Sequence, residues 1–275
     1  CNHIQTKNLP GDNYPADVSV EFEFNLVYPR QEHNAYIDRR ERIYQPKLNW
    51  ILDTLAELGY YDANLKTKQW CELGCGAGYF ISCLENMGYS DIKGIDTNLS
   101  LVSNGNKILT NPVLSISSLN ISEEVKNHDA DIYVLFFVLE HINDNKLFFE
   151  HFKTLPKNTI LIFSVPTFGF GTLVENIFSN QFSRHLDGVI HTQIFTDESI
   201  DYCLKLGGLT KKAEWIFGQD IDDMLRFFSN QIKTNYPETM YKRLQQKLFK
   251  LNDRFQESLD KIYFSDSRHI IAIKD

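Results

Sequence analysis

A glycine-rich turn is the feature of this sequence best suited to bind a small molecule. Residues Glu72–Gly78 read Glu-Leu-Gly-Cys-Gly-Ala-Gly, between a stretch typical of a buried strand and one with helical periodicity. Glycine has no β-carbon and tolerates positive φ, so a ligand can approach the backbone closely. The dinucleotide fingerprint needs a glycine where this chain has Tyr79, which disfavours a nicotinamide-dependent oxidoreductase.

Two carboxylates flank this turn in the expected fold. Asp96 ends the next apolar stretch, and its two oxygens can accept hydrogen bonds from both hydroxyls of a ribose. A helix N-cap is the structural alternative for Asp96. Glu72 ends a buried strand, where an ionised carboxylate is costly. We therefore expect Glu72 to accept backbone N–H groups or to reach an amino group of the ligand.

An alternation of strands and helices would position these groups. The expected strands are Gln69–Leu73, Asp91–Ile95, Val113–Ser117, Asp131–Phe136 and Thr159–Val165, and the expected helices are Tyr79–Met87, Leu99–Leu109 and Lys146–Phe152. Such alternation indicates an α/β fold whose parallel sheet carries helices on both faces. Ligands bind such sheets at the carboxyl ends of the strands, which is where the two carboxylates fall.

The flanking segments are less regular. Residues 1–34 read as an N-terminal extension with a short strand at Val18–Phe24, and Asn34–Leu58 as two helices meeting at Pro46. Residues 166–195 are typical of a loop or short-helix insertion over the site. The expected C-terminal elements are a helix at Asp197–Leu206, a strand at Ala213–Phe217, a long amphipathic helix or arm of a hairpin within 221–262, and a last strand at His269–Lys274.

Three motifs in order resemble those of the class I S-adenosylmethionine-dependent methyltransferases. Glu72–Phe80 is similar to their motif I, Gly94-Ile-Asp96 to the acidic end of their second strand, and Asp131–His141 to their fourth-strand motif. The resemblance covers roughly residues 69–165, given the usual boundary error. It implies a Rossmann-like, seven-stranded methyltransferase sheet with helices on both faces, an N-terminal extension and a C-terminal helical elaboration.

The resemblance also implies S-adenosylmethionine as cofactor. The residues expected to contact it are Glu72, Gly74, Cys75, Gly76, Gly78, Tyr79, Asp96, Thr97, Asn98, Ser118, Leu119, Phe136 and Phe137. Family members close N-terminal helices over the cofactor carboxylate, which would bring Tyr36, Arg39 and Arg40 near it.

Methyl transfer to a hydroxyl needs a positioned acceptor and a base that removes its proton. Histidine is the usual base, and the candidates are His141, His185 and His191, each with a purely structural role as the alternative. The segments His191–Ser199 and Glu214–Asp220 resemble methyltransferases of surface-polysaccharide biosynthesis. That likeness suggests a nucleotide sugar or phosphorylated metabolite as acceptor, methylated at oxygen.

The resemblance divides the chain into four segments. We expect an N-terminal extension and helix at 1–48, a cofactor-binding core at 49–165, and an acceptor-site insertion and helix at 166–212. Residues 213–275 would complete the sheet and form a lid.

Charge and cysteine usage limit the partners. The net charge is −8, and the densest basic run, Arg39, Arg40 and Arg42, is interrupted by Glu41, so we expect no nucleic acid. The five cysteines form no Cys-x-x-Cys pair and no histidines follow at the spacing of a zinc site, which predicts no metal site. The odd number of cysteines favours reduced thiols in the cytoplasm. With no long apolar run or secretory leader, we expect no membrane partner. We expect the protein to be a monomer or a homodimer.

Two other functions fit the same motifs. One is a non-catalytic S-adenosylmethionine-binding partner subunit, whose C-terminal helices would dock another chain. The other is a small-molecule N- or C-methyltransferase.

Overall fold

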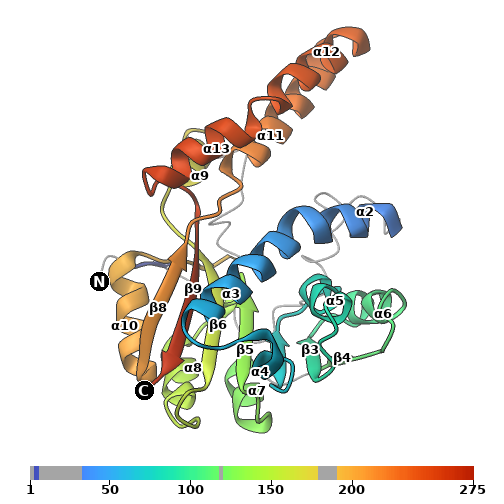
Figure 1. Ribbon diagram of the computed structural model, residues 1–275. Coiled ribbons are helices and arrows are strands. Elements are labelled where there is room, and N and C mark those ends of the chain that lie inside the picture. The colour runs from blue at the N-terminus through green and yellow to red at the C-terminus, as the bar shows by residue number, and fades with distance from the viewer. Residues whose placement is uncertain (1–2, 6–32, 118–119, 179–190) are drawn as a thin grey trace.

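A mixed seven-stranded sheet forms the centre of the computed structural model, which describes residues 3–5, 33–117, 120–178 and 191–275 (Figure 1). Its order is β4 (Leu114–Ile116), β3 (Ile92–Asp96), β2 (Trp70–Leu73), β5 (Ile132–Phe136), β6 (Ile160–Pro166), β9 (Ser267–Lys274) and β8 (Leu209–Trp215). The strands from β4 to β6 are parallel, and β9 is antiparallel to both of its neighbours. The predicted fold class is confirmed, although β8 begins earlier than the expected strand Ala213–Phe217.

Helices cover both faces of the sheet. The helices α3 (Gln45–Glu57), α5 (Tyr79–Asn86) and α6 (Leu99–Asn106) contribute to one buried cluster, and α8 (Asn145–Phe152) and α10 (Asp197–Gly207) to the other. Side chains alternate along β2, so Trp70 belongs to the first cluster and Cys71 and Leu73 to the second. Glu72 therefore faces the same side as Trp70, beneath α3 and α5.

The N-terminal helical segment is continuous rather than broken at Pro46. Helix α2 (His33–Arg39) runs through a π-helical turn, η1 (Arg40–Tyr44), directly into α3 (Figure 1). Pro46 lies in the first turn of α3, directly after the π-helical turn, so its missing N–H falls where the helical hydrogen-bond pattern changes. The expected break thus appears one turn earlier, as the π-helical segment that Gln45 closes by donating its N–H to the carbonyl of Arg40.

The insertion after β6 contains a helix, α9 (Phe170–Ile177), and a short strand, β7 (Gln193–Ile194). Strand β7 pairs antiparallel with β1 (Ile4–Gln5), a contact that the sequence did not predict. The short helices α4 (Asp62–Leu65) and α7 (Ile121–Asn127) were not predicted either. The strand expected at Val18–Phe24 lies outside the described residues.

A helical arm projects from the sheet (Figure 1). It consists of α11 (Asp220–Asn235), α12 (Glu238–Phe249) and α13 (Asn252–Lys261), and both later helices pack against α11. The single long helix was therefore wrong and the hairpin correct, because Pro237 lacks the N–H needed to continue α11. Asp220 anchors the arm by accepting hydrogen bonds from Gly171 N (2.7 Å), Gln256 Nε2 (3.1 Å) and Asp266 N (3.1 Å).

All three expected segment boundaries, after residues 48, 165 and 212, fall inside elements, namely α3, β6 and β8, and the division stays a prediction. Among the described residues, every helix is too short or too polar to cross a membrane.

The turn between β2 and α5 depends on glycines in the left-handed region. Gly74, Gly76 and Gly78 have φ of +74°, +53° and +70°. A β-carbon on Gly74 would lie 2.4 Å from Cγ2 of Val138, which follows β5. The turn is therefore both conformationally restricted and packed against its neighbour. Gly88 offers a comparison, because its φ is +81° but an added β-carbon meets nothing within 4 Å.

We predict that Gly74→Ala destabilises the fold more than Gly88→Ala. Both variants force alanine into the left-handed region, at about 1–2 kcal/mol. Only Gly74→Ala also overlaps a neighbouring side chain, which adds about 1–3 kcal/mol. Urea unfolding of both variants measures the difference. Equal losses of unfolding free energy would contradict the packing argument.

Candidate functional site

The glycine-rich turn is tied to the end of β3 by backbone and carboxylate hydrogen bonds. Gly74 N and Cys75 N both donate to the carbonyl of Ile95, at 2.8 and 3.0 Å. Gly76 N donates to Oδ2 of Asp96 at 2.7 Å, and Asn98 N donates to Oδ1 of Asp96 at 2.8 Å. A carboxylate has about four acceptor positions. Each oxygen of the half-buried Asp96 side chain therefore keeps capacity for a further donor.

The N-cap of α6 is Asn98, not Asp96. The Asn98 side chain accepts from Leu101 N at 3.0 Å. The structural alternative considered for Asp96 is thus taken by its neighbour. Thr97, between them, is exposed.

Cys75 contributes its backbone to the turn, and its thiol donates a weak hydrogen bond to the carbonyl of Gly76 at 3.7 Å. Its side chain is 5% exposed and faces the core, where a β-carbon on Gly94 would come within 2.9 Å of the sulfur. Burial raises the pKa of the Cys75 thiol well above its usual range. A thiolate is therefore disfavoured at this position.

Glu72 is buried beside the turn, with 3% exposure. Burial, and then the charge of Asp96, raises the pKa of Glu72 well above its usual range, while Lys47 and a backbone hydrogen bond at Ile81 act in the opposite direction. Among the described residues, the Oε2 atom of Glu72 has no hydrogen-bond partner. A cationic group of a ligand would favour the ionised form of this carboxyl.

An aromatic stack covers the turn from the N-terminal side. The ring of Tyr79 lies 4.3 Å from that of Tyr36 and 5.2 Å from that of Tyr44, both nearly parallel to it. The Tyr36 hydroxyl donates to the carbonyls of Ala77 (3.1 Å) and Gly78 (3.0 Å). These contacts place α2 and η1 directly against the start of α5.

The two arginines before the core differ in their contacts. The Arg39 guanidinium lies 5.5 Å from the centre of the Tyr79 ring, which brings a positive charge to the turn. Arg40 instead donates to Ser82 Oγ and pairs with Glu41.

Lys47 is a buried cation in the site, and it was not among the residues predicted from the sequence. It is 3% exposed, and its Nζ lies 4.8 Å and 4.9 Å from the ring centres of Phe136 and Phe137. The signal was its spacing, since Lys47 falls four residues after Ile43 and four before Ile51, both buried on the same helical face. A charge inside an apolar stripe marks a functional candidate.

Phe136 and Phe137 end β5 in different ways. Phe136 is 8% exposed and belongs to the core cluster. Phe137 is half-buried with φ of +56°, and its N–H donates to the carbonyl of Ser164 at 3.0 Å. Non-glycine residues in this region are strained and concentrate at functional sites.

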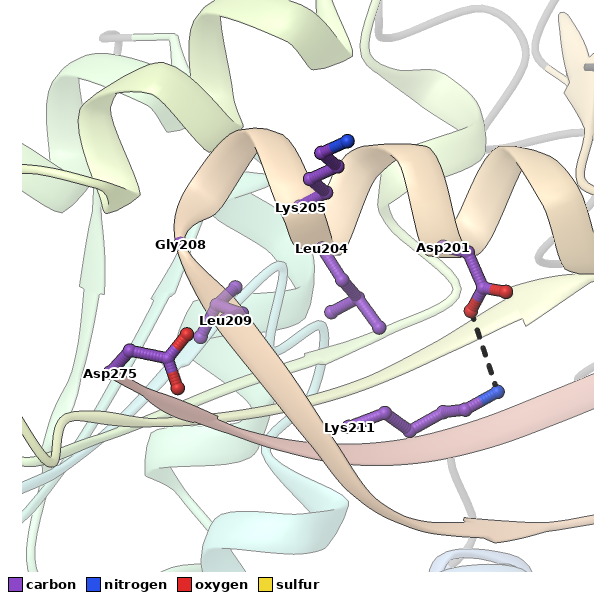
Figure 2. A pocket seen from close by; sticks show the side chains of 7 residues that line it. All are labelled: Asp201, Leu204, Lys205, Gly208, Leu209, Lys211 and Asp275. Carbon is purple, nitrogen blue, oxygen red and sulfur yellow. Dashed lines mark ion pairs between the residues drawn. The ribbon is translucent and has the colours of Figure 1, made fainter.

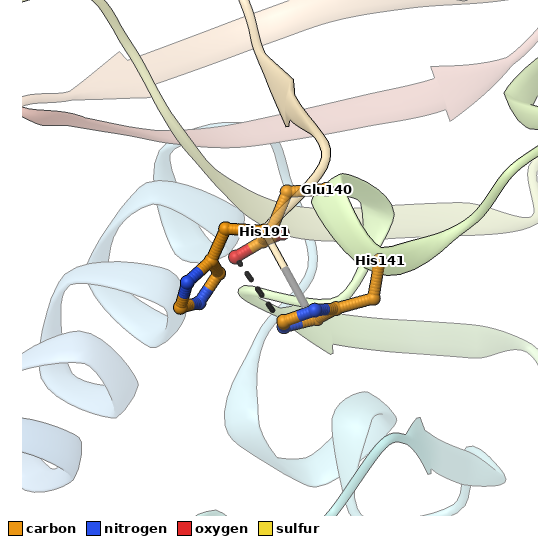
Figure 3. A group of neighbouring side chains, drawn as sticks. All are labelled: Glu140, His141 and His191. Atoms are coloured by element: carbon orange, nitrogen blue, oxygen red, sulfur yellow. Dashed lines mark ion pairs between the residues drawn. The ribbon is translucent and has the colours of Figure 1, made fainter. Parts of the chain in front are cut away.

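Glu140, His141 and His191 form a cluster after β5 (Figure 3). Glu140 and His141 lie on the 3₁₀ turn η2 (Leu139–His141), and the ring centres of His141 and His191 are 4.8 Å apart. The structure thus brings together two of the three predicted histidines. His185, like Ser118 and Leu119, lies outside the described residues.

A surface pocket lies elsewhere, between α10 and the start of β8 (Figure 2). Its lining includes Asp201, Lys211 and Asp275, and the Lys211 ammonium lies 3.7 Å from the Asp201 carboxylate. None of the predicted site residues that the structure describes lines it, so this pocket is separate from the glycine-rich turn.

Known structures share this fold at low sequence identity. The magnesium protoporphyrin IX methyltransferase of Synechocystis PCC 6803, with bound SAH, has a TM-score of 0.57 at 15% identity, over 94% of this chain and 95% of that chain. A protein described as a sarcosine dimethylglycine methyltransferase from Galdieria sulphuraria has a TM-score of 0.53 at 12% identity, over 82% and 84%. A SAM-dependent methyltransferase from Archaeoglobus fulgidus has a TM-score of 0.50 at 13% identity, over 88% of this chain and 100% of that chain.

The sequence comparisons give one positive result. No curated protein sequence matches the chain significantly. A family profile described as a methyltransferase domain matches residues 37–213, more than half of the chain, from α2 through the sheet to β8. The chain therefore belongs to this family of methyltransferase domains.

Proposed function

We propose that this chain is an S-adenosylmethionine-dependent methyltransferase that methylates an oxygen of a small saccharide-like or phosphorylated precursor of a surface polysaccharide. The observation that carries the first half is the Asp96 carboxylate, fixed at 2.7 Å from Gly76 N with acceptor capacity remaining at the end of β3. The fold and family support the same conclusion.

The residues present fit this cofactor. Asp96 would accept both ribose hydroxyls, since its remaining acceptor positions match a diol. Glu72 Oε2, buried without a described hydrogen-bond partner, would accept from the cofactor's amino group. The Arg39 guanidinium over Tyr79 would neutralise the cofactor carboxylate. When bound, the cofactor supplies a methyl group on an electrophilic sulfonium.

The chain's own task is then to position the acceptor and to take its proton. The acceptor oxygen forms a bond to the methyl carbon as the carbon–sulfur bond breaks, and the hydroxyl proton must leave. His141 lies on η2 after β5, and His191 lies just before β7 with its ring 4.8 Å from that of His141. They are the described histidines proposed to receive that proton.

The acceptor class rests on a weaker argument. The proteins that share this fold act, by their descriptions, on a porphyrin and on sarcosine or dimethylglycine, so the fold does not select an acceptor. The likeness of His191–Ser199 and Glu214–Asp220 to polysaccharide-pathway methyltransferases supports a saccharide-like acceptor. His191 itself belongs to the histidine cluster, and the rest of His191–Ser199 continues through β7 to the start of α10.

We predict that Asp96→Ala weakens S-adenosylmethionine binding by roughly 100-fold or more. Two hydrogen bonds to a charged group are lost, each contributing about 1.5–3 kcal/mol. Isothermal calorimetry measures the dissociation constant, with Asp91→Ala, an exposed change just before β3, as the matched control. An Asp96→Ala protein that binds as tightly as the wild type would refute the cofactor site.

We also predict that binding releases a proton from Glu72. The free protein holds the pKa of Glu72 above its usual range, and a cationic cofactor lowers it, so affinity rises with pH while Glu72 titrates. Calorimetry in two buffers of different ionisation enthalpy measures the released proton. Glu72→Gln should abolish the release, whereas Glu57→Gln at an exposed position should not. The same proton release in wild type and Glu72→Gln would exclude this role.

The acceptor is tested by a screen of nucleotide sugars and phosphorylated metabolites with the cofactor. We expect one member of these classes to gain the mass of a CH₂ group, detected by mass spectrometry, and to lose that gain with Asp96→Ala enzyme. Turnover only with amines or carbon acids would contradict oxygen methylation. Cofactor binding without turnover of any acceptor would favour the non-catalytic subunit instead.

A further inference from the structure

The cluster of Glu140, His141 and His191 combines a carboxylate with two imidazoles. One possible ligand atom from each residue lies within 4.8 Å of the other two. Figure 3 shows the two rings and the carboxylate converging from η2 and from the segment before β7. Two histidines and one carboxylate are a recurrent donor set for divalent transition metals in sites with an open coordination position.

The distance between the possible ligand atoms of His141 and Glu140 is longer than a hydrogen bond and close to the distance between two ligand atoms bound to one metal ion. His141 Nε2 and Glu140 Oε1 are 4.0 Å apart, beyond hydrogen-bonding distance. Metal–ligand bonds of about 2.0–2.2 Å place neighbouring ligand atoms roughly 3.3 Å apart in a tetrahedral site. Small side-chain rotations would close the cluster onto a cation.

The three side chains of the cluster differ in how far they are exposed to solvent. Glu140 has 1% side-chain exposure and His141 has 34%, with His191 between buried and exposed. A buried carboxylate is stabilised by pairing or by coordinating a metal. The exposed side, at His141, leaves room for a further ligand from solvent or substrate.

The backbone holds the two parts of the cluster together. Thr192 donates to the carbonyl of Glu140 through its N (3.3 Å) and its Oγ1 (3.0 Å). Asn145 Nδ2 donates to the carbonyl of Leu139 and to Gln193 Oε1, each at 2.9 Å. The residue after His191 is thus fixed to Glu140, so the donor set is organised before any ion binds.

The cluster also adjoins the proposed cofactor site. Val138, two residues before Glu140, is the residue against which Gly74 packs. Both the cluster and the glycine-rich turn therefore follow the carboxyl ends of parallel strands of the same sheet.

From these observations we infer that Glu140, His141 and His191 form a binding site for a divalent transition-metal cation, with Zn²⁺ as the representative ion. Magnesium and calcium prefer all-oxygen ligands and fit this donor set poorly. Its catalytic role rests on the proposed function: a cation there lowers the pKa of an acceptor hydroxyl that binds it. With the cation bound, the hydroxyl proton leaves to solvent and the two histidines act as metal ligands. Only in the metal-free protein would they receive the proton as proposed above.

The test measures metal binding directly. Chelator-stripped full-length protein is titrated with Zn²⁺ against a chromophoric chelator, and with Co²⁺ while its visible absorption is recorded. We expect one equivalent of tight binding, a Co²⁺ spectrum typical of nitrogen and oxygen ligands, and little competition from Mg²⁺. His141→Ala and His191→Ala should each weaken Zn²⁺ binding by roughly 10–100-fold or more. Because the side chain of His141 is exposed, we expect His141→Ala to fold as the wild type does, and circular dichroism checks this.

His128→Gln is the matched control. His128 also lies beside a glutamate, with its Nε2 2.8 Å from Glu124 Oε2, but outside the cluster. This variant should bind Zn²⁺ as the wild type does. Absence of binding in the wild type, or equal losses in His141→Ala and His128→Gln, would overturn the inference.

Calorimetry with S-adenosylmethionine separates this inference from the proposed function. His141→Ala should lose the metal and keep the cofactor, whereas Asp96→Ala should lose the cofactor and keep the metal. Wild-type protein that binds Zn²⁺ but no S-adenosylmethionine would refute the proposed function and leave the metal site standing.

Discussion

The hydrogen bond from Gly76 N to the Asp96 carboxylate is the contact on which the proposed site depends. It joins the turn after β2 to the end of β3 at 2.7 Å, and the bonds from Gly74 and Cys75 to Ile95 strengthen the same junction. Because the two strands are parallel neighbours, their carboxyl ends meet at one edge of the sheet. The positive φ values of the glycines let the backbone turn sharply enough for the N–H of Gly76 to face that carboxylate. Val138 then fills the space that a side chain at Gly74 would need, so β5 is held in the same arrangement.

This part of the molecule could be predicted from the sequence, because its determinants are local. Buried parallel strands appear as short apolar runs, and the glycines and Asp96 follow them at fixed positions. Outside the core, the prediction depended on whether a proline breaks a helix. Pro46 lies in the first turn of α3 and does not interrupt the helical segment. Pro237 follows the end of α11, so the single helix that was predicted there is a hairpin. The difference follows from position, because Pro46 lies in the first turn of α3 whereas Pro237 stands between the end of α11 and the start of α12.

Other features required the fold. Lys47 belongs to a helix before the core, yet its ammonium group lies over Phe136, the last residue of the distant β5, and over Phe137, which follows it. His141 and His191 were each predicted as a base, but the sequence does not show that they meet beside Glu140. The prediction of no metal site was based on the spacing of cysteines and histidines along the sequence, which says nothing about a cluster assembled from two separate segments. The pairing of β1 with β7 is another contact between distant segments that no local pattern encodes.

In the proposed function, the cofactor binds at the ends of β2 and β3, and the acceptor binds near β5, η2 and β7. A crystal structure of the protein grown with S-adenosylhomocysteine tests the central claim most directly. The account predicts that both ribose hydroxyls lie within hydrogen-bonding distance of the Asp96 carboxylate, with the ligand against the glycine-rich turn. A ligand bound elsewhere, or with its ribose turned away from Asp96, would contradict it.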